Sequence, residues 1–263
     1  MVALIIALSL FVIAIVLFIH FIIKRDRGHK EPRSALFAAM GFGVLAVLLA
    51  GELNSIFIPR EIFEAIQSKT SGTLPGSTLF ISAMKVGVIE ETLKILPLTL
   101  FIYRKSYFDE LTDGIIYFGI TALTFGILED ISYTIQFGAG VGIFRIIISP
   151  YLHAGFTILF GMYLVQHKVL KRPWLVVLAG YLAAVFSHGI YDYFAFSGGV
   201  LGIISVLVIT VSLNVGLFVF YRRAQKIDES RGQSAIGINK FCRNCGKPNP
   251  KRLLYCSSCG KHS

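Results

Sequence analysis

The stretch KVGVIEETLKILPLTL, residues 85–100, places two adjacent carboxylates and a lysine inside a long apolar run. Glu90 and Glu91 stand side by side, and Lys94 follows Glu90 by one helical turn. The whole apolar run, about 78–103, can cross a bilayer as a helix, which takes roughly 20 residues. Because an ionisable group is costly at that depth, such groups in a spanning helix usually serve a function. We therefore expect the rest of the chain to supply partners for this helix.

The composition is typical of a polytopic membrane protein. Of the 263 residues, 55% are hydrophobic and only 15% are charged, whereas a soluble domain carries about 25% charged residues. Mean hydropathy is +0.71. The net charge of +10 would suggest nucleic acid in a soluble protein, but in a membrane protein it is typical of cytoplasmic loops rich in Lys and Arg. All four cysteines follow residue 241, so none can cross-link an extracellular domain.

Long apolar runs alternate with short polar loops along the chain. The runs predict about seven transmembrane helices, at 2–23, 35–51, 78–103, 111–137, 143–166, 174–196 and 200–221. No Lys or Arg precedes the first run and no small-residue cleavage site follows it, which favours a spanning helix over a signal peptide. The mixed stretch 52–78 is expected to hold a short amphipathic helix at the outer surface. The predicted fold is an all-α polytopic membrane protein.

The distribution of basic residues predicts the orientation. Lys and Arg occur in loops 24–33, 104–110 and 167–173 and in the C-terminal tail, but not in loops 138–142 and 197–199. The loop between the second and third runs carries only two. Under the positive-inside rule, the N-terminus lies outside and the C-terminus lies in the cytoplasm.

The tail contains two CxxC pairs. In FCRNCGKPNPKRLLYCSSCG, Cys242 pairs with Cys245 and Cys256 pairs with Cys259. Four thiolates at this spacing can surround Zn²⁺ tetrahedrally, and so small a domain rarely folds without such a centre. The sequence therefore predicts a structural zinc ribbon over 240–263. Four cysteines leave the zinc no open position, which indicates docking to a cytoplasmic partner or regulation rather than chemistry.

The chain thus divides into three predicted parts. Residues 1–223 form the membrane domain, 224–239 form a polar linker, and 240–263 form the zinc ribbon.

Ionisable side chains recur at one depth on four of the predicted helices. They are Glu90, Glu129, His153, His188 and Asp192. At about 1.5 Å of rise per residue, most of these groups lie roughly 12 to 18 Å below the outer ends of their helices. A shared layer is typical of a buried active site or ion site. Neighbouring polar groups are expected to support it, namely Asp130, Tyr133, Arg145 and Tyr191.

Helical spacing pairs several of these groups. Glu90 and Lys94 are four residues apart and share a helix face, as do His188 and Asp192. An aspartate one turn from a histidine can orient the ring. Such groups either activate water for hydrolysis or carry protons and ions. The alternative for each is a structural contact between helices.

The order of these residues resembles the PrsW family of intramembrane proteases, which is related to the CAAX-processing and bacteriocin-protection membrane proteases. The likeness rests on EExxK, FxxxE, H and HxxxD in successive apolar runs, here at residues 90–94, 125–129, 153 and 188–192. It implies proteolysis within or beside a prokaryotic cell membrane. The implied substrate is a membrane-anchored protein, such as an anti-sigma factor.

The resemblance also implies roles for the site residues. Glu90 would be the general base that acts on water, and Glu91 would be its partner or a structural carboxylate, although the sequence does not distinguish which of the two is the base. Glu129 and His153 would position the water or a metal ion.

His188 and Asp192 would orient the group that faces the tetrahedral oxyanion. The family has been treated both as metalloproteases and as glutamate-dependent proteases. No HExxH motif occurs in this sequence, so the usual zinc-protease signature is absent. We therefore expect glutamate-activated water and keep a catalytic metal as the alternative.

Two other function classes remain open at this stage. The same carboxylates could form the proton path of a transporter, although no inverted repeat is evident. A non-catalytic membrane scaffold could keep the fold, although the retained glutamate pair argues against it.

Overall fold

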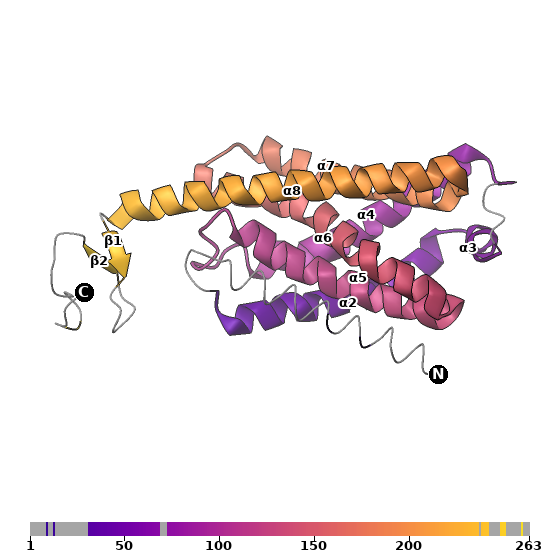
Figure 1. Ribbon diagram of the computed structural model, residues 1–263, viewed down its shortest axis with the longest axis horizontal. Coiled ribbons are helices and arrows are strands. Elements are labelled where there is room, and N and C mark those ends of the chain that lie inside the picture. The colour runs from indigo at the N-terminus through magenta and orange to yellow at the C-terminus, as the bar shows by residue number, and fades with distance from the viewer. Residues whose placement is uncertain are drawn as a thin grey trace.

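A bundle of long helices forms the body of the protein (Figure 1). The computed structural model describes residues 31–68, 73–236, 238–241 and 248–250, together with residues 9, 13 and 259. Its long helices are α2 (Arg33–Phe57), α4 (Gly76–Phe101), α5 (Asp113–Phe137), α6 (Ala139–Leu170), α7 (Trp174–Ser197) and α8 (Gly199–Ile236). The first predicted helix, at 2–23, lies outside the described residues apart from positions 9 and 13.

The predicted apolar runs from residue 35 onward coincide with these long helices. Within the described residues, α2, α5, α6, α7 and α8 are each long and apolar enough to cross a membrane. The helix α4 has 26 residues, but Glu90, Glu91 and Lys94 lower its hydropathy. It packs against α2 and α7 inside the bundle. The prediction of an all-α polytopic membrane protein is therefore confirmed.

Two kinds of short element accompany the bundle. The helix α3 (Arg60–Gln67) follows α2 and confirms the predicted amphipathic helix, with Ile62 buried and Arg60 exposed. The strands β1 (Ile238–Phe241) and β2 (Pro248–Pro250) pair antiparallel near the C-terminus.

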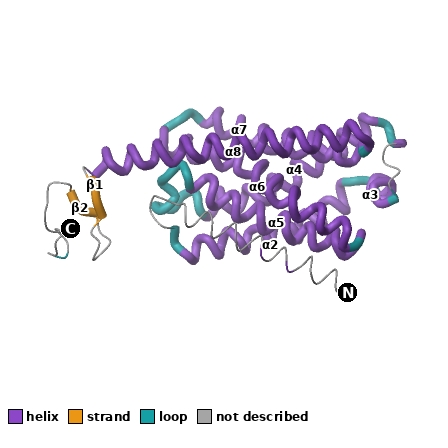
Figure 2. The backbone as a smooth tube through the Cα atoms, viewed as in Figure 1, coloured by secondary structure: helices purple, strands orange, loops and turns teal. Residues whose placement is uncertain are grey.

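Proline and glycine set the boundaries of the helices. Pro32, Pro75 and Pro173 occupy the positions just before α2, α4 and α7, where a residue without an N–H leaves no donor unpaired. Gly138 and Gly198 have positive φ angles of 91° and 65°, which glycine adopts without strain. The resulting turns are short, and the teal segments in Figure 2 show how little chain lies outside the helices.

The inner face of α2 is built from small residues. They are Ala35, Ala39, Gly43, Ala46 and Ala50. Large apolar side chains such as Phe37 and Leu48 point outward and are more than half exposed. This distribution suits a helix between protein and lipid, because small residues allow backbones to approach closely while lipid solvates the large ones.

Glycines bring α4 and α7 into backbone contact beside the predicted site. A Cβ atom on Gly87 would lie 2.8 Å from the carbonyl oxygen of Val185 and 3.0 Å from the nitrogen of Gly189. Only a residue without a side chain fits between these backbones. The close crossing places Glu90 and Glu91, one turn beyond Gly87, against His188.

The helix α8 extends well past the end of the bundle and leads to β1 (Figure 1). The segment predicted as a linker, 224–239, is therefore helical as far as Ile236. Asp228 fixes this extension to the bundle, because its carboxylate accepts hydrogen bonds from the backbone N–H groups of Leu111 and Thr112 at 2.8 and 2.9 Å. A carboxylate at the start of α5 also suits the positive end of the helix dipole.

The predicted zinc ribbon falls largely outside the described residues. Cys242, Cys245 and Cys256 are among those not described, and Cys259 is described alone. The ribbon and its zinc therefore stay a prediction.

Replacing Gly87 by alanine tests the α4–α7 contact. The added Cβ meets backbone atoms of α7, so Gly87→Ala is expected to lower the free energy of unfolding by about 1–3 kcal/mol. Gly41→Ala on α2 is the matched control, because nothing lies within 4 Å of a Cβ there. Unfolding in detergent, followed by circular dichroism, measures both variants. Equal unfolding free energies would contradict the close contact.

Candidate active site

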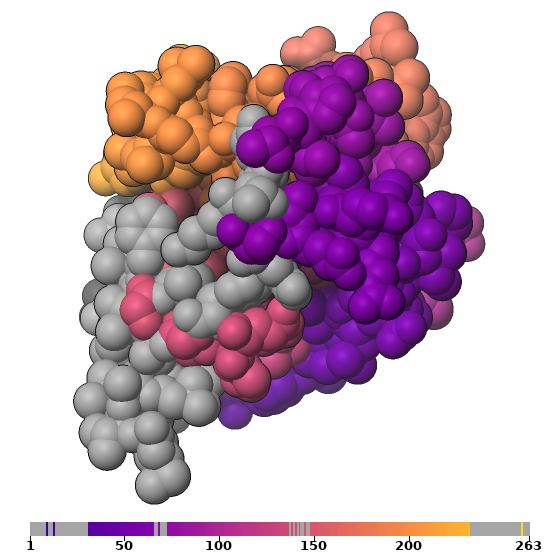
Figure 3. Space-filling model, turned by 90° about the vertical axis from the view of Figure 1, so that its right-hand side faces the viewer, coloured from indigo at the N-terminus to yellow at the C-terminus, as the bar shows by residue number. Residues whose placement is uncertain are grey.

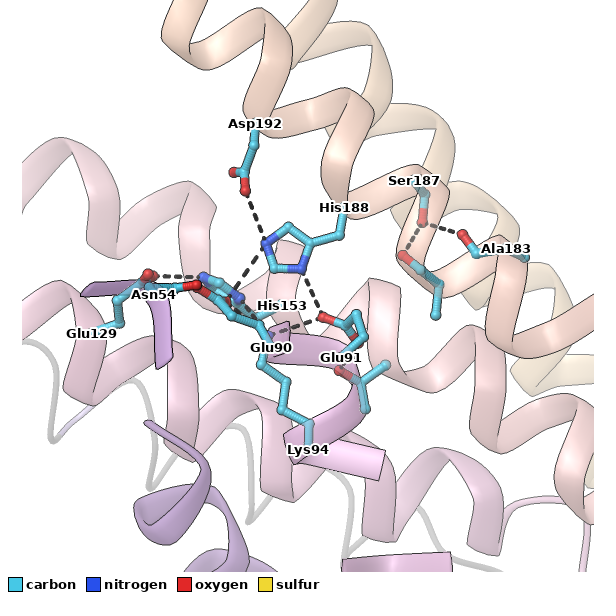
Figure 4. A network of polar contacts seen from close by, with 12 residues as sticks. Asn54, Glu90, Glu91, Lys94, Glu129, His153, Ala183, Ser187, His188 and Asp192 are labelled. Atoms are coloured by element: carbon cyan, nitrogen blue, oxygen red, sulfur yellow. Dashed lines mark hydrogen bonds and ion pairs between the residues drawn. The ribbon is translucent and has the colours of Figure 1, made fainter. Parts of the chain in front are cut away.

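The ammonium group of Lys94 lies at the centre of a buried polar network (Figure 4). It donates hydrogen bonds to Glu91 Oε1 at 2.9 Å, to Glu90 Oε2 at 3.3 Å and to His153 Nδ1 at 3.2 Å. The ring of Phe125 covers it, with 3.9 Å between Nζ and the ring centroid. The Lys94 side chain is 0% exposed. A cation so fully removed from water depends on these carboxylates for its stability.

Glu91 is enclosed on every side by hydrogen-bond donors. Its Oε1 accepts from Lys94 and from His188 Nδ1, the latter at 2.8 Å, and its Oε2 accepts from Thr157 Oγ1 at 2.7 Å. The Glu91 side chain is 0% exposed. These contacts tie α4 to α6 and α7, and they leave this carboxylate little freedom to react.

Glu90 lies at the wall of a cavity. Its Oε1 accepts a hydrogen bond from Asn54 Nδ2 at 3.3 Å, while Oε2 faces Lys94. His188 Nε2 is 3.7 Å from Glu90 Oε2 and 3.5 Å from Asp192 Oδ2. The predicted pairing of His188 with Asp192 thus places the ring between two carboxylates. The ring also stacks on Phe156, with centroids 4.9 Å apart.

Glu129 and His153 form the opposite wall. His153 Nδ1 faces the Lys94 ammonium and therefore accepts, so Nε2 carries the proton that it donates to Glu129 Oε2 at 2.9 Å. Arg145 Nη2 donates to the same Glu129 oxygen at 3.0 Å, and Arg145 Nε donates to Asp130 at 2.5 Å. Arg145 and Asp130 were expected to support the site. They do so through Arg145, which bonds both Asp130 and Glu129 and so holds Glu129 in place.

The cavity between these walls has a volume of about 430 Å³. Its lining includes five of the predicted site residues, namely Glu90, Glu129, His153, His188 and Asp192. Glu91 and Lys94 lie behind the wall and do not line it. The two glutamates of the EExxK motif therefore occupy different environments, one facing the cavity and one enclosed.

The cavity lies toward the bundle end that carries α3. Its lining includes Asn54 near the end of α2, Phe63 on α3, Gln136 near the end of α5 and Phe196 near the end of α7. Figure 3 looks at this end of the molecule, where the purple atoms of the α2–α4 region occupy much of the face. The extension of α8 leaves the bundle at the other end (Figure 1).

Asn54 and Thr157 belong to the network, although no motif predicted them. Asn54 comes from α2, which contributes no motif residue, and Thr157 is one of many hydroxyl residues in the helices. The spacing of Thr157 was the available signal, since it follows His153 by one helical turn. No comparable spacing marked Asn54.

Three candidate metal ligands meet in the cavity. One atom each from Glu90, His153 and His188 lie within 4.8 Å of one another. Two imidazoles and a carboxylate form a donor set suited to zinc, whose tetrahedral ligands lie about 3.4 Å apart. The Glu91 carboxylate accepts from His188 Nδ1, as second partners of metal-bound histidines do. His153 would have to release Glu129 or Lys94 to bind, because both of its nitrogens are hydrogen-bonded.

Comparison with known proteins assigns the chain to a family. The family described as PrsW family intramembrane metalloprotease matches residues 31–220. Among the relatives named Protease PrsW, that of Geobacillus kaustophilus is 29% identical over 64% of this chain and 70% of its own length. That of Clostridioides difficile is 26% identical over 71% of this chain and 79% of its own length.

The relative from Bacillus subtilis, also named Protease PrsW, is 27% identical over 64% of this chain and 73% of its own length. No solved structure matches the chain. The family match spans α2 to most of α8 and includes every residue of the buried network described above. The chain therefore belongs to the PrsW family of intramembrane metalloproteases.

Proposed function

We propose that this intramembrane protease cleaves membrane-anchored proteins with water activated by Glu90. The observation that carries the proposal is the different placement of the two adjacent glutamates. Glu90 lines the cavity, and its side chain keeps 4% exposure. Glu91 has both oxygens occupied by donors and is 0% exposed.

Glu90 then acts as the general base. Its carboxylate takes a proton from water while the water oxygen attacks the carbonyl carbon of the scissile peptide bond. The proton is returned to the leaving nitrogen as the C–N bond breaks, so Glu90 ends the reaction as it began. Lys94, hydrogen-bonded to Glu90 at 3.3 Å, compensates the negative charge near the base without facing the cavity.

The other cavity residues hold the reactants. His153 and Glu129, joined at 2.9 Å, position the water opposite Glu90. His188 is oriented by Glu91 through Nδ1 and presents Nε2 to the cavity, close to Asp192. The carboxylates of Glu90 and Asp192 near Nε2 favour the imidazolium form of this ring, and in that form Nε2–H can donate toward the oxyanion that develops on the substrate carbonyl.

A catalytic metal is the alternative that the donor set permits. Glu90, His153 and His188 would hold it. When bound, zinc would lower the pKa of its water to about 7 and polarise the carbonyl. The enclosed Glu91 keeps the same task in either case, because it accepts the hydrogen bond from Nδ1 and so sets the direction of His188.

The predicted orientation and the position of the cavity together indicate the side of the membrane on which we propose that the substrate is cut. Basic loops predict that the C-terminal tail is cytoplasmic, and the cavity lies toward the other end of the bundle. The cavity then opens to the outer half of the membrane, and the substrate is cut near the outer end of its anchor. The predicted zinc ribbon would recruit a cytoplasmic partner, and an anti-sigma factor is the proposed kind of substrate.

Paired glutamine variants test the roles of the two glutamates. Glu90→Gln is expected to lower the cleavage rate by about 10²- to 10⁴-fold, the usual contribution of a general base, while the fold persists. Glu91→Gln is expected to reduce both cleavage and thermal stability, because it removes the negative charge that neutralises Lys94 and leaves a single oxygen to accept from Lys94, His188 and Thr157. Purified protein in detergent with a quenched-fluorescent single-pass substrate gives the rates.

Wild-type rates in Glu90→Gln would contradict the assignment of the base. Proton flux in liposomes without any cleavage would instead indicate a transporter.

Metal analysis distinguishes the two forms of the mechanism. We expect one zinc per full chain, bound by Cys242, Cys245, Cys256 and Cys259, and none after removal of residues 240–263. Elemental analysis of both proteins after dialysis measures this. A second zinc that survives truncation and disappears in His188→Ala would assign the metal to the cavity.

A further inference from the structure

Asn54 reaches the base from a helix that carries none of the family's motifs. It lies on α2, three residues before the helix ends at Phe57, and its amide is 3.3 Å from Glu90 Oε1. A carboxylate oxygen accepts hydrogen bonds and does not donate them. The atom that faces Glu90 must therefore be the amide nitrogen, which turns the amide oxygen away from the carboxylate (Figure 4).

That amide oxygen is a buried acceptor without a partner. Asn54 Oδ1 is one of the few buried polar atoms in the described part of the chain that have no hydrogen bond. Among the residues that carry such atoms, only Asn54 also lines the cavity. A buried acceptor of this kind is normally satisfied by some group. Its place beside the base indicates that the group is brought by what enters the cavity.

We propose that Asn54 is a further active-site residue with two tasks. Its Nδ2 positions Glu90, and its Oδ1 accepts a hydrogen bond from a backbone N–H of the bound peptide substrate. The proposal rests on the proposed function, because it takes Glu90 as the base and a polypeptide as the ligand.

The environment of Glu90 explains the first task. Lys94 holds Oε2 at 3.3 Å and Asn54 holds Oε1 at 3.3 Å, so donors from two helices fix the plane of the carboxylate. Loss of the Asn54 donor leaves one oxygen unrestrained on the side of the cavity. A base that rotates spends less time aligned with the water it must activate.

The membrane explains the second task. A substrate strand that unwinds for cleavage exposes backbone N–H groups, which find no partner in a lipid environment. A fixed amide oxygen in the cavity wall offers one of these groups an acceptor. Because the interaction is with the backbone, it imposes no requirement on the substrate side chain.

Two substitutions separate the tasks. Asn54→Leu keeps the size and removes both donor and acceptor, whereas Asn54→Asp removes the donor and keeps an acceptor. Both variants are expected to lower kcat on the order of 10- to 100-fold, as for other residues that orient a reacting group. Affinity is measured in the Glu90→Gln background, where the uncleaved single-pass substrate can be titrated. There Asn54→Leu weakens binding about tenfold, the loss expected when one hydrogen bond is removed, and Asn54→Asp does not.

Asn214→Leu is the matched control. Asn214 is also a part-buried asparagine in a spanning helix, but its amide donates to Thr210 O of its own helix at 2.8 Å, and Asn214 does not line the cavity. Its kcat and KM should equal those of the wild type.

The outcomes for Asn54 and for the proposed function can be told apart. If Glu90→Gln cleaves the substrate at the wild-type rate, the proposed function is overturned, and the Asn54 proposal with it. If Glu90→Gln is inactive, wild-type kcat and affinity in Asn54→Leu overturn the Asn54 proposal alone. A fall in unfolding temperature with unchanged kcat per folded molecule also overturns it, because that is the result of a purely structural contact.

Discussion

The ion cluster of Lys94 with Glu90 and Glu91 is the interaction on which the site depends. Its three charged groups are at most 4% exposed, and none could remain charged there alone, since a buried unpaired charge costs several kcal/mol. Each group instead forms ion pairs and hydrogen bonds within the cluster. Because the partners come from α2, α4, α6 and α7, the cluster can form only when these helices have packed in one arrangement.

The helix packing is adapted to this cluster. Gly87 lets α4 approach the backbone of α7 so that both glutamates reach His188. Gly126 on α5 does the same for His153, since a Cβ there would lie 2.7 Å from the imidazole ring. In a membrane, close packing of small residues replaces the hydrophobic effect as a source of helix association. The same contacts therefore stabilise the bundle and set the distances within the site.

The apolar runs and the i, i+4 pairs were sufficient to predict much of this structure. Run length identified the helices from α2 to α8, and spacing joined Glu90 to Lys94 and His188 to Asp192. Which glutamate faces the cavity could not be predicted, because adjacent residues differ only in helix rotation and that is fixed by packing. Asn54 was missed for the same reason, since a single amide on a helix has no periodic signal. The helical extension to Ile236 was missed because its charged sequence resembles a linker, and its docking through Asp228 depends on tertiary contacts.

Lys94 organises the active site from behind the cavity wall, and a matched pair of lysine variants tests this role. Lys94→Met keeps the length of the side chain and removes the buried charge, whereas Lys85→Met removes an exposed charge two to three turns earlier on the same helix. Stability and substrate cleavage would be measured for both in detergent. The account predicts that Lys94→Met loses about 3–5 kcal/mol of stability and its cleavage activity, while Lys85→Met keeps both. A Lys94→Met protein that is as stable and as active as the wild type would contradict it.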